Sequence, residues 1–333
     1  MTGTLLLARA DVRALLPIRD CIEAVEAAFR AQAEAAIPSA VLGLHAPAGG
    51  FHIKAGGLRL SRLYVAAKIN ANFPGNPSKG LPTIQGLVAL YDGDDGRPLA
   101  VMDSIEVTAL RTAAATAVAA RVLARSDAST VALCGCGVQG SYQVKALAVV
   151  RSLAAVRVHD RDHDRARRCA ADLAAETGVP VSVADDWPEA ARSADIVVTC
   201  TTSKAPIVGT ADVRPGAFLA AVGADNPEKN EVAPELLARS RVYVDSLAQA
   251  STIGDLHHAL ARGVLRPEDV QAELWEVVAG RKAGRGSDDE ITVFDSTGVA
   301  VQDVAAAALV YERAEAAGRG LRFDLGASSR GDR

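Results

Sequence analysis

The second half of the chain alternates short apolar runs with longer, more polar stretches. A strand that is buried on both faces appears in sequence as such a run. The stretch from Arg161 to Glu176, rich in Ala, Arg and Asp, is typical of a helix with one polar face. This alternation, from Asp127 to about Phe294, predicts an α/β fold with a doubly wound parallel sheet. The predicted strands are Val131 to Leu133, Val156 to Val158, Val179 to Val183, Ile196 to Cys200, Phe218 to Val222 and Val242 to Val244.

The first part of the chain has a different pattern. Residues Ile18 to Ala36 have the apolar spacing of an amphipathic helix. Segments between Val41 and Met102 resemble strands divided by Gly, Pro and Asn turns. We therefore expect a separate α+β domain before the doubly wound sheet.

Two Ala-rich helices connect the predicted domains. The helix from Ser104 to Ala124 carries the chain into the second domain, and the helix from Val301 to Ala317 returns it to the first. The sequence thus predicts a domain of residues 1–120 with 300–333, and a second domain of residues 121–299.

Three glycines follow the first strand of the predicted sheet. In the segment from Val131 to Gly140, the chain turns through Gly135, Gly137, Val138, Gln139 and Gly140 into helix-forming sequence. The first glycine permits a tight turn, the second lets a pyrophosphate approach the backbone, and the third lets helix and strand pack closely. The segment predicts a Rossmann-type site for a nicotinamide dinucleotide.

A carboxylate ends the next predicted strand at Asp160. Its distance from the glycines is that expected for an acid that accepts hydrogen bonds from a ribose. Such an acid repels a 2′-phosphate, so we expect NAD as the cofactor. Arg161 and Arg165 follow closely and keep NADP as the alternative.

Composition narrows the class of partner. The chain has 333 residues, 49% of them hydrophobic, and a formal net charge of -4 without a basic cluster. Nucleic-acid binding depends on grouped Lys and Arg, so these features argue against a nucleic-acid partner. No apolar run approaches the ~20 residues of a membrane span, and the N-terminus lacks the pattern of a signal peptide. We expect a cytoplasmic protein with small-molecule partners.

The cysteines indicate neither a disulfide framework nor a metal site. There are five, an odd number, and they are scattered along the chain. Cys134 and Cys136 flank Gly135, but no other Cys or His pair has zinc-ligand spacing. We interpret these two as small side chains that pack around the turn.

Two cations in apolar surroundings are candidates for a carboxylate site. Lys68 lies at the end of a predicted strand, and Arg111 lies in a helix of small, apolar residues. Arg can hold a carboxylate through two parallel hydrogen bonds, which favours a substrate-binding role for Arg111. The alternative for Lys68 is an ordinary exposed strand lysine.

Asp225 follows Gly223 just beyond a predicted core strand. Doubly wound sheets bind their ligands at this carboxyl edge, so Asp225 is a candidate general acid or base. The alternative is a turn or a helix N-cap. Cys200 and Thr201 end another strand at the same edge, where we expect them to line the cofactor.

The chain resembles the ornithine cyclodeaminase/mu-crystallin family, which includes archaeal-type alanine dehydrogenase and ketimine reductases. The likeness covers almost the whole chain and rests on seven motifs in one order. They are Lys68 with Asn72-Phe73-Pro74-Gly75-Asn76, Gly80-Leu81-Pro82-Thr83-Ile84-Gln85-Gly86, Pro98-Leu99-Ala100-Val101-Met102-Asp103, Thr108-Ala109-Leu110-Arg111-Thr112-Ala113-Ala114, the glycine turn with Gln139, Gly223-Ala224-Asp225, and Asp295-Ser296-Thr297-Gly298.

The resemblance implies roles for these residues. Lys68 and Arg111 would hold an α-carboxylate with Thr83 nearby, and Asp225 would handle protons beside the nicotinamide. It also implies a homodimer joined through the N-terminal domains. The predicted catalytic residues are Asp225 and Lys68. Further residues predicted to bind the cofactor are Thr112, Cys200, Thr201, Gly223 and Ser296.

The chain departs from the cyclodeaminases of this family at the substrate side chain. They place an arginine shortly after the first helix and an acid upstream of the lysine, to receive the ornithine amine. Here the segment from Ile37 to Val41 has no arginine, and Lys54 stands where the acid is needed. A cation facing an ammonium group is unfavourable. Lys54 is instead predicted to bind a carboxylate, with an exposed strand lysine as the alternative.

The sequence thus predicts an oxidoreductase that moves hydride between NAD(P) and Cα of a small α-amino or α-imino acid. This includes amino-acid dehydrogenases and imino-acid or ketimine reductases. The alternative is an ornithine cyclodeaminase, which forms proline and ammonia and recycles NAD. A second alternative is a non-catalytic protein that binds a small ligand.

Overall fold

The chain forms two compact units that meet within one helix. In the computed structural model, which describes residues 3–325, unit 1 comprises Met1–Arg111 and Val299–Arg333, and unit 2 comprises Thr112–Gly298. The division falls inside α3 (Ser104–Leu123), earlier than the boundary expected after residue 120. The Ala-rich sequence of α3 favours an unbroken helix, so no loop marks the boundary.

Unit 1 is built on a seven-stranded sheet with the order β17-β1-β6-β5-β4-β3-β2. Strands β2 to β6 form an antiparallel meander, β1 pairs parallel to β6, and β17 pairs antiparallel to β1. The bounds are β1 (Thr4–Leu7), β2 (Ala36–Ala46), β3 (Gly49–Arg59), β4 (Leu63–Asn72), β5 (Ile84–Asp92), β6 (Pro98–Asp103) and β17 (Leu321–Phe323).

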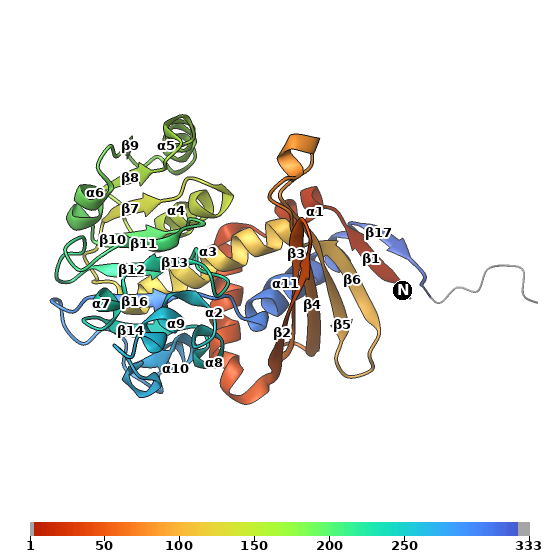
Figure 1. The fold of residues 1–333 in the computed structure, drawn as a ribbon. Coiled ribbons are helices and arrows are strands. Elements are labelled where there is room, and N and C mark those ends of the chain that lie inside the picture. Colours follow the sequence, from red (N-terminus) through yellow and green to blue (C-terminus); the bar gives the residue numbers. More distant parts are fainter. Residues whose placement is uncertain (1–2, 326–333) are drawn as a thin grey trace, which may run out of the picture. The chain divides into compact units, whose positions relative to one another are not determined.

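One face of this sheet is covered by helices, including α11 (Ala300–Ala317), which packs along β3 and β4 (Figure 1). A Cβ at Gly56 would lie 2.8 Å from the Cβ of Ala300, so only glycine allows this close approach. The C-terminal helix therefore returns to the N-terminal unit. The other helices of unit 1 are α1 (Arg9–Leu15), α2 (Ile18–Ala35) and the 3-10 helix η1 (Asn76–Lys79).

The amphipathic pattern of α2 is borne out in its packing. Ile22, Val25 and Phe29 are spaced at three or four residues and are fully buried. α11 packs against this apolar face, so the two ends of the chain share one core.

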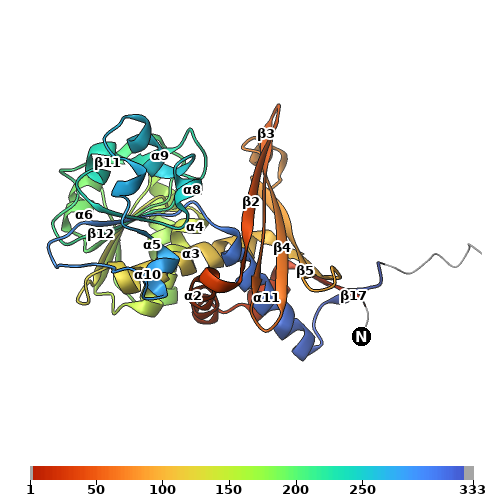
Figure 2. The ribbon, with the colours of Figure 1, turned by 90° about the horizontal axis from the view of Figure 1, so that it is seen from below.

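Unit 2 is built on an eight-stranded parallel sheet, with the order β15-β14-β16-β12-β10-β7-β8-β9 and helices on both faces (Figures 1 and 2). The strand order reverses between β7 and β10, and such a switch point is where doubly wound sheets bind ligands. The strands are β7 (Thr130–Cys134), β8 (Ala155–His159), β9 (Val181–Val183), β10 (Ile196–Thr199), β12 (Phe218–Ala221), β14 (Arg241–Val244), β15 (Ala272–Glu273) and β16 (Thr292–Asp295).

Short elements complete unit 2. A two-stranded sheet of β11 (Lys204–Val208) and β13 (Asn230–Val232) lies outside the main sheet. The helices are α4 (Val138–Val150), α5 (His163–Thr177), α6 (Trp187–Ser193), α7 (Pro234–Leu237), α8 (Leu247–Ala250), α9 (Gly254–Ala261), η2 (Pro267–Asp269) and α10 (Leu274–Val278). No helix in the described part of the chain is long and apolar enough to cross a membrane.

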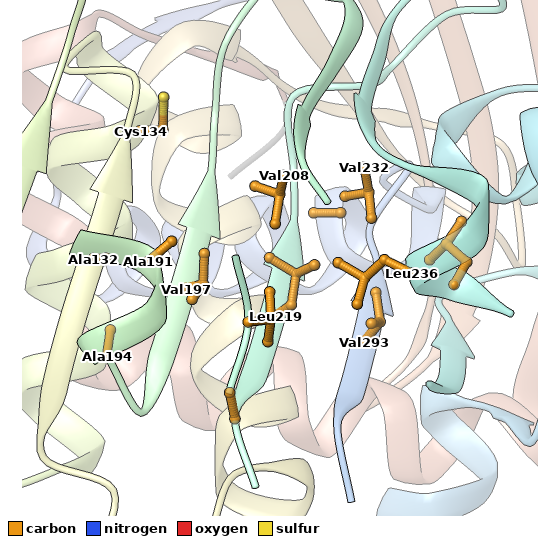
Figure 3. Packing of buried hydrophobic residues seen from close by; sticks show 14 of the residues in the cluster. Ala132, Cys134, Ala191, Ala194, Val197, Val208, Leu219, Val232, Leu236 and Val293 are labelled. Atoms are coloured by element: carbon orange, nitrogen blue, oxygen red, sulfur yellow. The ribbon is translucent and has the colours of Figure 1, made fainter. Parts of the chain in front are cut away.

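The core of unit 2 is formed where strand side chains meet the covering helices. Val197, Leu219 and Val293 from three neighbouring strands pack together, with Leu236 of α7 against them (Figure 3). Each is at most 1% exposed, and burying such a side chain contributes about 1.5–3 kcal/mol. Cys134 belongs to the same cluster, so it packs as a small apolar side chain.

The apolar runs predicted the strands of unit 2 well, but the short strands were missed. β16 is central to the sheet, yet its apolar run is only Val293-Phe294, with Thr292 and Asp295 at its ends. β11, β13 and β15 span only two to five residues each. These segments lack the apolar run that marked the other short strands, and tertiary pairing rather than local pattern stabilises them.

Candidate active site

The three glycines after β7 each meet a different steric requirement. Gly135 has a φ of +102°, and a Cβ there would lie 2.4 Å from the carbonyl oxygen of Cys200. A Cβ on Gly140 would lie 2.0 Å from the carbonyl oxygen of Gly135. Around Gly137 the space is open, so a pyrophosphate has room to approach the backbone. The turn fits a dinucleotide.

Helix α4 begins directly after this turn. Its N-cap is Gly137, and no side chain caps the helix among the described residues. Val138 and Gln139 occupy the first turn, where the helix dipole favours negative charge. The N-terminus of α4 therefore has the chemistry of a phosphate site.

Asp160 connects the end of β8 to the glycine turn. One carboxylate oxygen accepts a hydrogen bond from the backbone N–H of Cys136 at 2.9 Å, and the other accepts from the N–H of Asp162 at 2.9 Å. Arg165 lies 3.7 Å from the same carboxylate, whereas Arg161 is exposed. A carboxylate retains acceptor capacity beyond these bonds, so Asp160 fits a ribose diol beside the turn.

The loops after β10 and β12 lie next to the glycine turn at the same sheet edge. A Cβ on Gly223 would lie 2.5 Å from the carbonyl oxygen of Thr201, just as one on Gly135 would meet Cys200. Ser296, after β16, donates its backbone N–H to Ala221 at 2.9 Å. Its Oγ is buried and has no hydrogen-bond partner among the described residues.

Asp225 projects from the loop after β12, and its side chain is 54% exposed. Its carboxylate accepts a hydrogen bond from the Nζ of Lys229 at 2.7 Å. No helix begins at Asp225, and Asn226 instead caps the turn by accepting from the N–H groups of Glu228 and Lys229. The helix N-cap alternative for Asp225 is wrong, whereas the turn alternative stays open. The carboxylate of Asp225 is accessible.

Unit 1 gathers Lys68 and Arg111 around one buried carboxylate, that of Asp303 on α11. The Nζ of Lys68 donates to Oδ1 of Asp303 at 2.7 Å, and the Nε of Arg111 donates to the same oxygen at 2.9 Å. The three residues are 2–5% exposed. The interpretation of Lys68 as an exposed strand lysine is therefore wrong.

The cluster alters the acidity of its members. Burial, and next the charge of Arg111, lower the pKa of Lys68 from 10.5 to about 7, although Asp303 acts in the opposite direction. Burial by itself would raise the pKa of Asp303, but the charges of Arg111 and Lys68 outweigh it and hold that pKa below its usual value. Burial and the neighbouring cations therefore make the charged form of Lys68 less favoured than in an exposed lysine.

Gln302 extends the cluster on α11. Its Oε1 accepts a hydrogen bond from Arg111 at 2.8 Å. Its Nε2 and the Oδ2 of Asp303 are buried and have no partner among the described residues. A buried donor beside Lys68 and Arg111 matches the oxygen of a substrate carboxylate.

Lys54 lies opposite Lys68 on the neighbouring strand. The two residues are register partners in β3 and β4, so their side chains share a face of the sheet. The charge of Lys54 contributes to lowering the pKa of both Lys68 and Asp303. Lys54 is half-buried and belongs to the same electrostatic environment as the cluster.

Two other predicted residues lie near these elements in sequence. Thr83 precedes β5, and its carbonyl accepts the backbone N–H of Phe73 at 2.8 Å. Thr112 follows Arg111 in α3 and begins unit 2. Their roles in substrate and cofactor binding stay predictions.

Sequence reasoning missed Asp303, Gln302, Lys229 and Glu231. Gln302 and Asp303 are an adjacent polar pair in the otherwise apolar first half of a helix, and that contrast was the available signal. Glu231 binds the loops after β10 and β12 through the N–H groups of Thr201 and Gly223. It lies in a short strand that had no clear pattern.

A dinucleotide turn at the switch point of a parallel sheet, together with a buried cation cluster, defines a nicotinamide-dependent oxidoreductase. The model of the ornithine cyclodeaminase/mu-crystallin family matches residues 2–318. The chain belongs to this family, as its sequence motifs predicted.

Relatives within the family include oxidoreductases and an ornithine cyclodeaminase. The chain is 39% identical to an alanine dehydrogenase of Archaeoglobus fulgidus, with 93% of this chain and 95% of the relative covered. It is 35% identical to the iminosuccinate reductase of Paracoccus denitrificans, with 93% and 97% covered. The predictions of the family and of an enzyme in it are confirmed.

Solved structures with the same fold contain nicotinamide cofactors. An archaeal alanine dehydrogenase, a dimer with bound NAD, has a TM-score of 0.92 and 38% identity, covering 97% of this chain and 100% of that chain. The Thermococcus litoralis Δ1-pyrroline-2-carboxylate reductase, with NADH and L-proline, has a TM-score of 0.91 and 32% identity, covering 96% and 99%. The predicted Rossmann-type fold and the choice of NAD agree with both structures.

Proposed function

We propose that the protein moves hydride between NAD and Cα of a small α-imino or α-amino acid, as an amino-acid dehydrogenase or an imino-acid reductase. The observation that carries this proposal is the pair of buried cations, Lys68 and Arg111, held on one carboxylate oxygen of Asp303. A buried cluster with more donors than acceptors is suited to a substrate carboxylate.

In this proposal Arg111 and Lys68 bind the α-carboxylate, and Gln302 offers a further N–H donor. Asp303 fixes the two cations in place, because its Oδ1 accepts from both. Thr83 is assigned to the same carboxylate. Unit 1 is assigned as the substrate-binding and dimerisation domain.

The cofactor is assigned to unit 2, which begins at Thr112. Gly135, Gly137, Val138, Gln139 and Gly140 would receive the pyrophosphate, and Asp160 with Arg161 would flank the ribose. Bound NADH supplies the hydride. The remaining cofactor contacts are assigned to Thr112, Cys200, Thr201, Gly223 and Ser296.

Asp225 is assigned the proton transfer at the substrate nitrogen. Reduction of an imine adds one hydride at carbon and one proton at nitrogen, and the reverse reaction removes both. An exposed carboxylate can move that proton, and Lys229 at 2.7 Å orients it. Lys68, with a pKa lowered to about 7, is the second candidate for proton transfer.

Ornithine cyclodeamination is disfavoured by Lys54. Its register position places it on the sheet face of Lys68, so a substrate ammonium group would approach an already cationic surface. A substrate with a neutral or acidic side chain meets no such repulsion. A purely non-catalytic ligand-binding role has no feature of this chain in its favour.

We also propose a homodimer formed through the open face of the unit 1 sheet. Leu42, Ile53, Ile69 and Leu87 are successive register partners across β2 to β5, on the face opposite Lys68. Three of them, Leu42, Ile69 and Leu87, are 39–53% exposed, and contiguous apolar surface of this kind marks an interface. A hollow of about 690 Å³ on unit 1, lined by residues including Leu6, Leu87 and Leu321, adds to the argument.

A cytoplasmic location and the absence of nucleic-acid and membrane partners stay predictions from the sequence. The experiment that tests the proposed function is incubation with NADH and a panel of cyclic and acyclic α-imino acids, followed by absorbance and product analysis. Stoichiometric NADH consumption with formation of the amino acid supports it. Conversion of ornithine to proline and ammonia without net change in NADH would establish the cyclodeaminase instead.

A further inference from the structure

We propose that Glu231 is a positioning residue that clamps the loops after β10 and β12 and thereby sets the place of Asp225 in the reaction. Its carboxylate is fully buried beneath these loops. Oε1 accepts the backbone N–H of Thr201 at 2.6 Å, and Oε2 accepts the N–H of Gly223 at 2.8 Å. One side chain thus ties together two loops of the ligand-binding edge.

The contact between Glu231 and Gly223 leaves no room for a side chain. A Cβ at Gly223 would lie 2.4 Å from Oε2 of Glu231 and 2.5 Å from the carbonyl oxygen of Thr201. Glycine is therefore required here by close approach. The φ of Gly223 is not positive, so backbone strain is not the reason.

The same arrangement reaches the cofactor turn. The carbonyl of Cys200 lies so close to Gly135 that a Cβ there would meet it at 2.4 Å. The glycine turn, the Thr201 loop and the Gly223 loop are consequently stacked in order along the sheet edge. Glu231 binds the Thr201 loop and the Gly223 loop and holds them together.

Asp225 depends on this clamp through a short chain of contacts. Its backbone N–H donates to the carbonyl of Gly223 at 3.1 Å, and the Nζ of Lys229 donates to that carbonyl at 3.2 Å as well as to Asp225. A shift of Gly223 therefore moves both the carboxylate and its cationic partner. A displacement of ~1 Å at a reacting group can cost about 100-fold in rate.

Asp255 in turn holds the backbone of Glu231 in place. Oδ1 of Asp255 accepts the backbone N–H groups of Glu231 at 2.6 Å and Val232 at 2.9 Å. Burial raises the pKa of Glu231, while the N–H donors of Thr201 and Gly223 oppose the rise because they stabilise the charged form. The ionised carboxylate carries no proton of its own, so the hydrogen bonds from both loops favour the charged form.

The test compares the wild type with Glu231→Gln, which keeps the shape but turns one acceptor into a donor facing an N–H group. The inference rests on the proposed role of Asp225, so we expect kcat for imino-acid reduction to fall about 100-fold. The imino-acid KM should change less than ~3-fold, because Lys68 and Arg111 are untouched. Glu235→Gln, at an exposed glutamate of α7, is the matched control and should match the wild type.

Amide hydrogen exchange gives a readout that a general loss of stability would not reproduce. In Glu231→Gln, the amides of Thr201 and Gly223 should lose protection while those of the core strand β10 keep it. Unchanged protection at both amides together with unchanged kcat would overturn the inference. Exchange does not depend on turnover, so it tests the clamp even if the wild type reduces no imino acid and the proposed function fails.

Gly223→Ala is the second variant. Its added Cβ would lie 2.4 Å from Oε2 of Glu231, so it disturbs the same contact from the side of the loop. It should lower kcat to a similar extent. The double variant should be no slower than the slower single variant, since both remove the same interaction. If Glu231→Gln does not fold, Gly223→Ala decides alone, and an unchanged kcat would overturn the inference.

Discussion

Lys68 and Asp303 form a buried ion pair, with 2.7 Å between Nζ and Oδ1, although they are 235 residues apart in the chain. The pair joins a strand of the N-terminal sheet to the C-terminal helix. Arg111 shares the same carboxylate oxygen, so one acid holds both proposed carboxylate ligands. This relationship determines the acidity and the placement of the proposed substrate site.

The fall of kcat/KM at alkaline pH should reflect the deprotonation of Lys68. Its pKa is lowered to about 7, so the cation is present below that pH and is lost as pH rises through it. Because a charged Lys68 binds the carboxylate, kcat/KM should fall above pH 7. Lys68→Arg keeps the charge at all these pH values and should move this fall to higher pH. A kcat/KM that instead rises through pH 7 would mean that the neutral amine is the active form.

Asp303→Asn should weaken both stability and substrate binding. It removes the charge that compensates two buried cations, and breaking such a pair typically costs ~3–5 kcal/mol. We expect a lower free energy of unfolding in urea and a higher KM for the imino acid. Asp94→Asn removes an acid from an exposed pair with Arg59 and should change neither quantity appreciably. Equal behaviour of the two variants would contradict the assigned role.

Asp225→Asn should abolish proton transfer and leave the cofactor site intact. General acid–base groups contribute about 10²- to 10⁴-fold, so kcat should fall by that order. NADH affinity, measured by fluorescence titration, should stay within ~2-fold because the glycine turn and Asp160 are unchanged. Full turnover in Asp225→Asn would remove Asp225 from the mechanism.

Asp160→Ser should shift the choice of cofactor. The carboxylate repels a 2′-phosphate, and Arg165 at 3.7 Å is placed to receive one once the acid is gone. The ratio of kcat/KM for NADPH over NADH should rise about tenfold or more, equivalent to ~1.4 kcal/mol. Part of the loss with NADH will reflect the hydrogen bond from Cys136. A ratio that stays at the wild-type value would show that Asp160 does not select the cofactor.

Leu87→Glu should dissociate the proposed dimer. It places a charge in the middle of the apolar row on the open face of the unit 1 sheet, where burial against a second copy would be unfavourable. Sedimentation velocity should show a monomer at micromolar concentration. Val264→Glu changes a similarly exposed apolar residue of unit 2 and should leave the dimer unaffected.

The sequence was most informative where function depends on local geometry. The turn through Gly135, Gly137 and Gly140 is set by contacts within one βα unit, and its spacing alone predicted it. Lys68, Arg111 and Asp225 could be selected because each is a charge in apolar or edge surroundings. Their partners could not, because Asp303 is brought to Lys68 only by the return of α11 to the first unit. Glu231 was missed for a related reason, since the loops it binds are brought together by the pairing of β10 with β12.

The most direct test of the account is the stoichiometry of cofactor and product with purified protein. We predict that NADH is oxidised one for one with formation of an amino acid from a small α-imino acid, and that Lys68→Met and Arg111→Met each raise the KM for that acid. Absence of NADH oxidation with every cyclic and acyclic imino acid, together with proline and ammonia formed from ornithine at constant NADH, would contradict it.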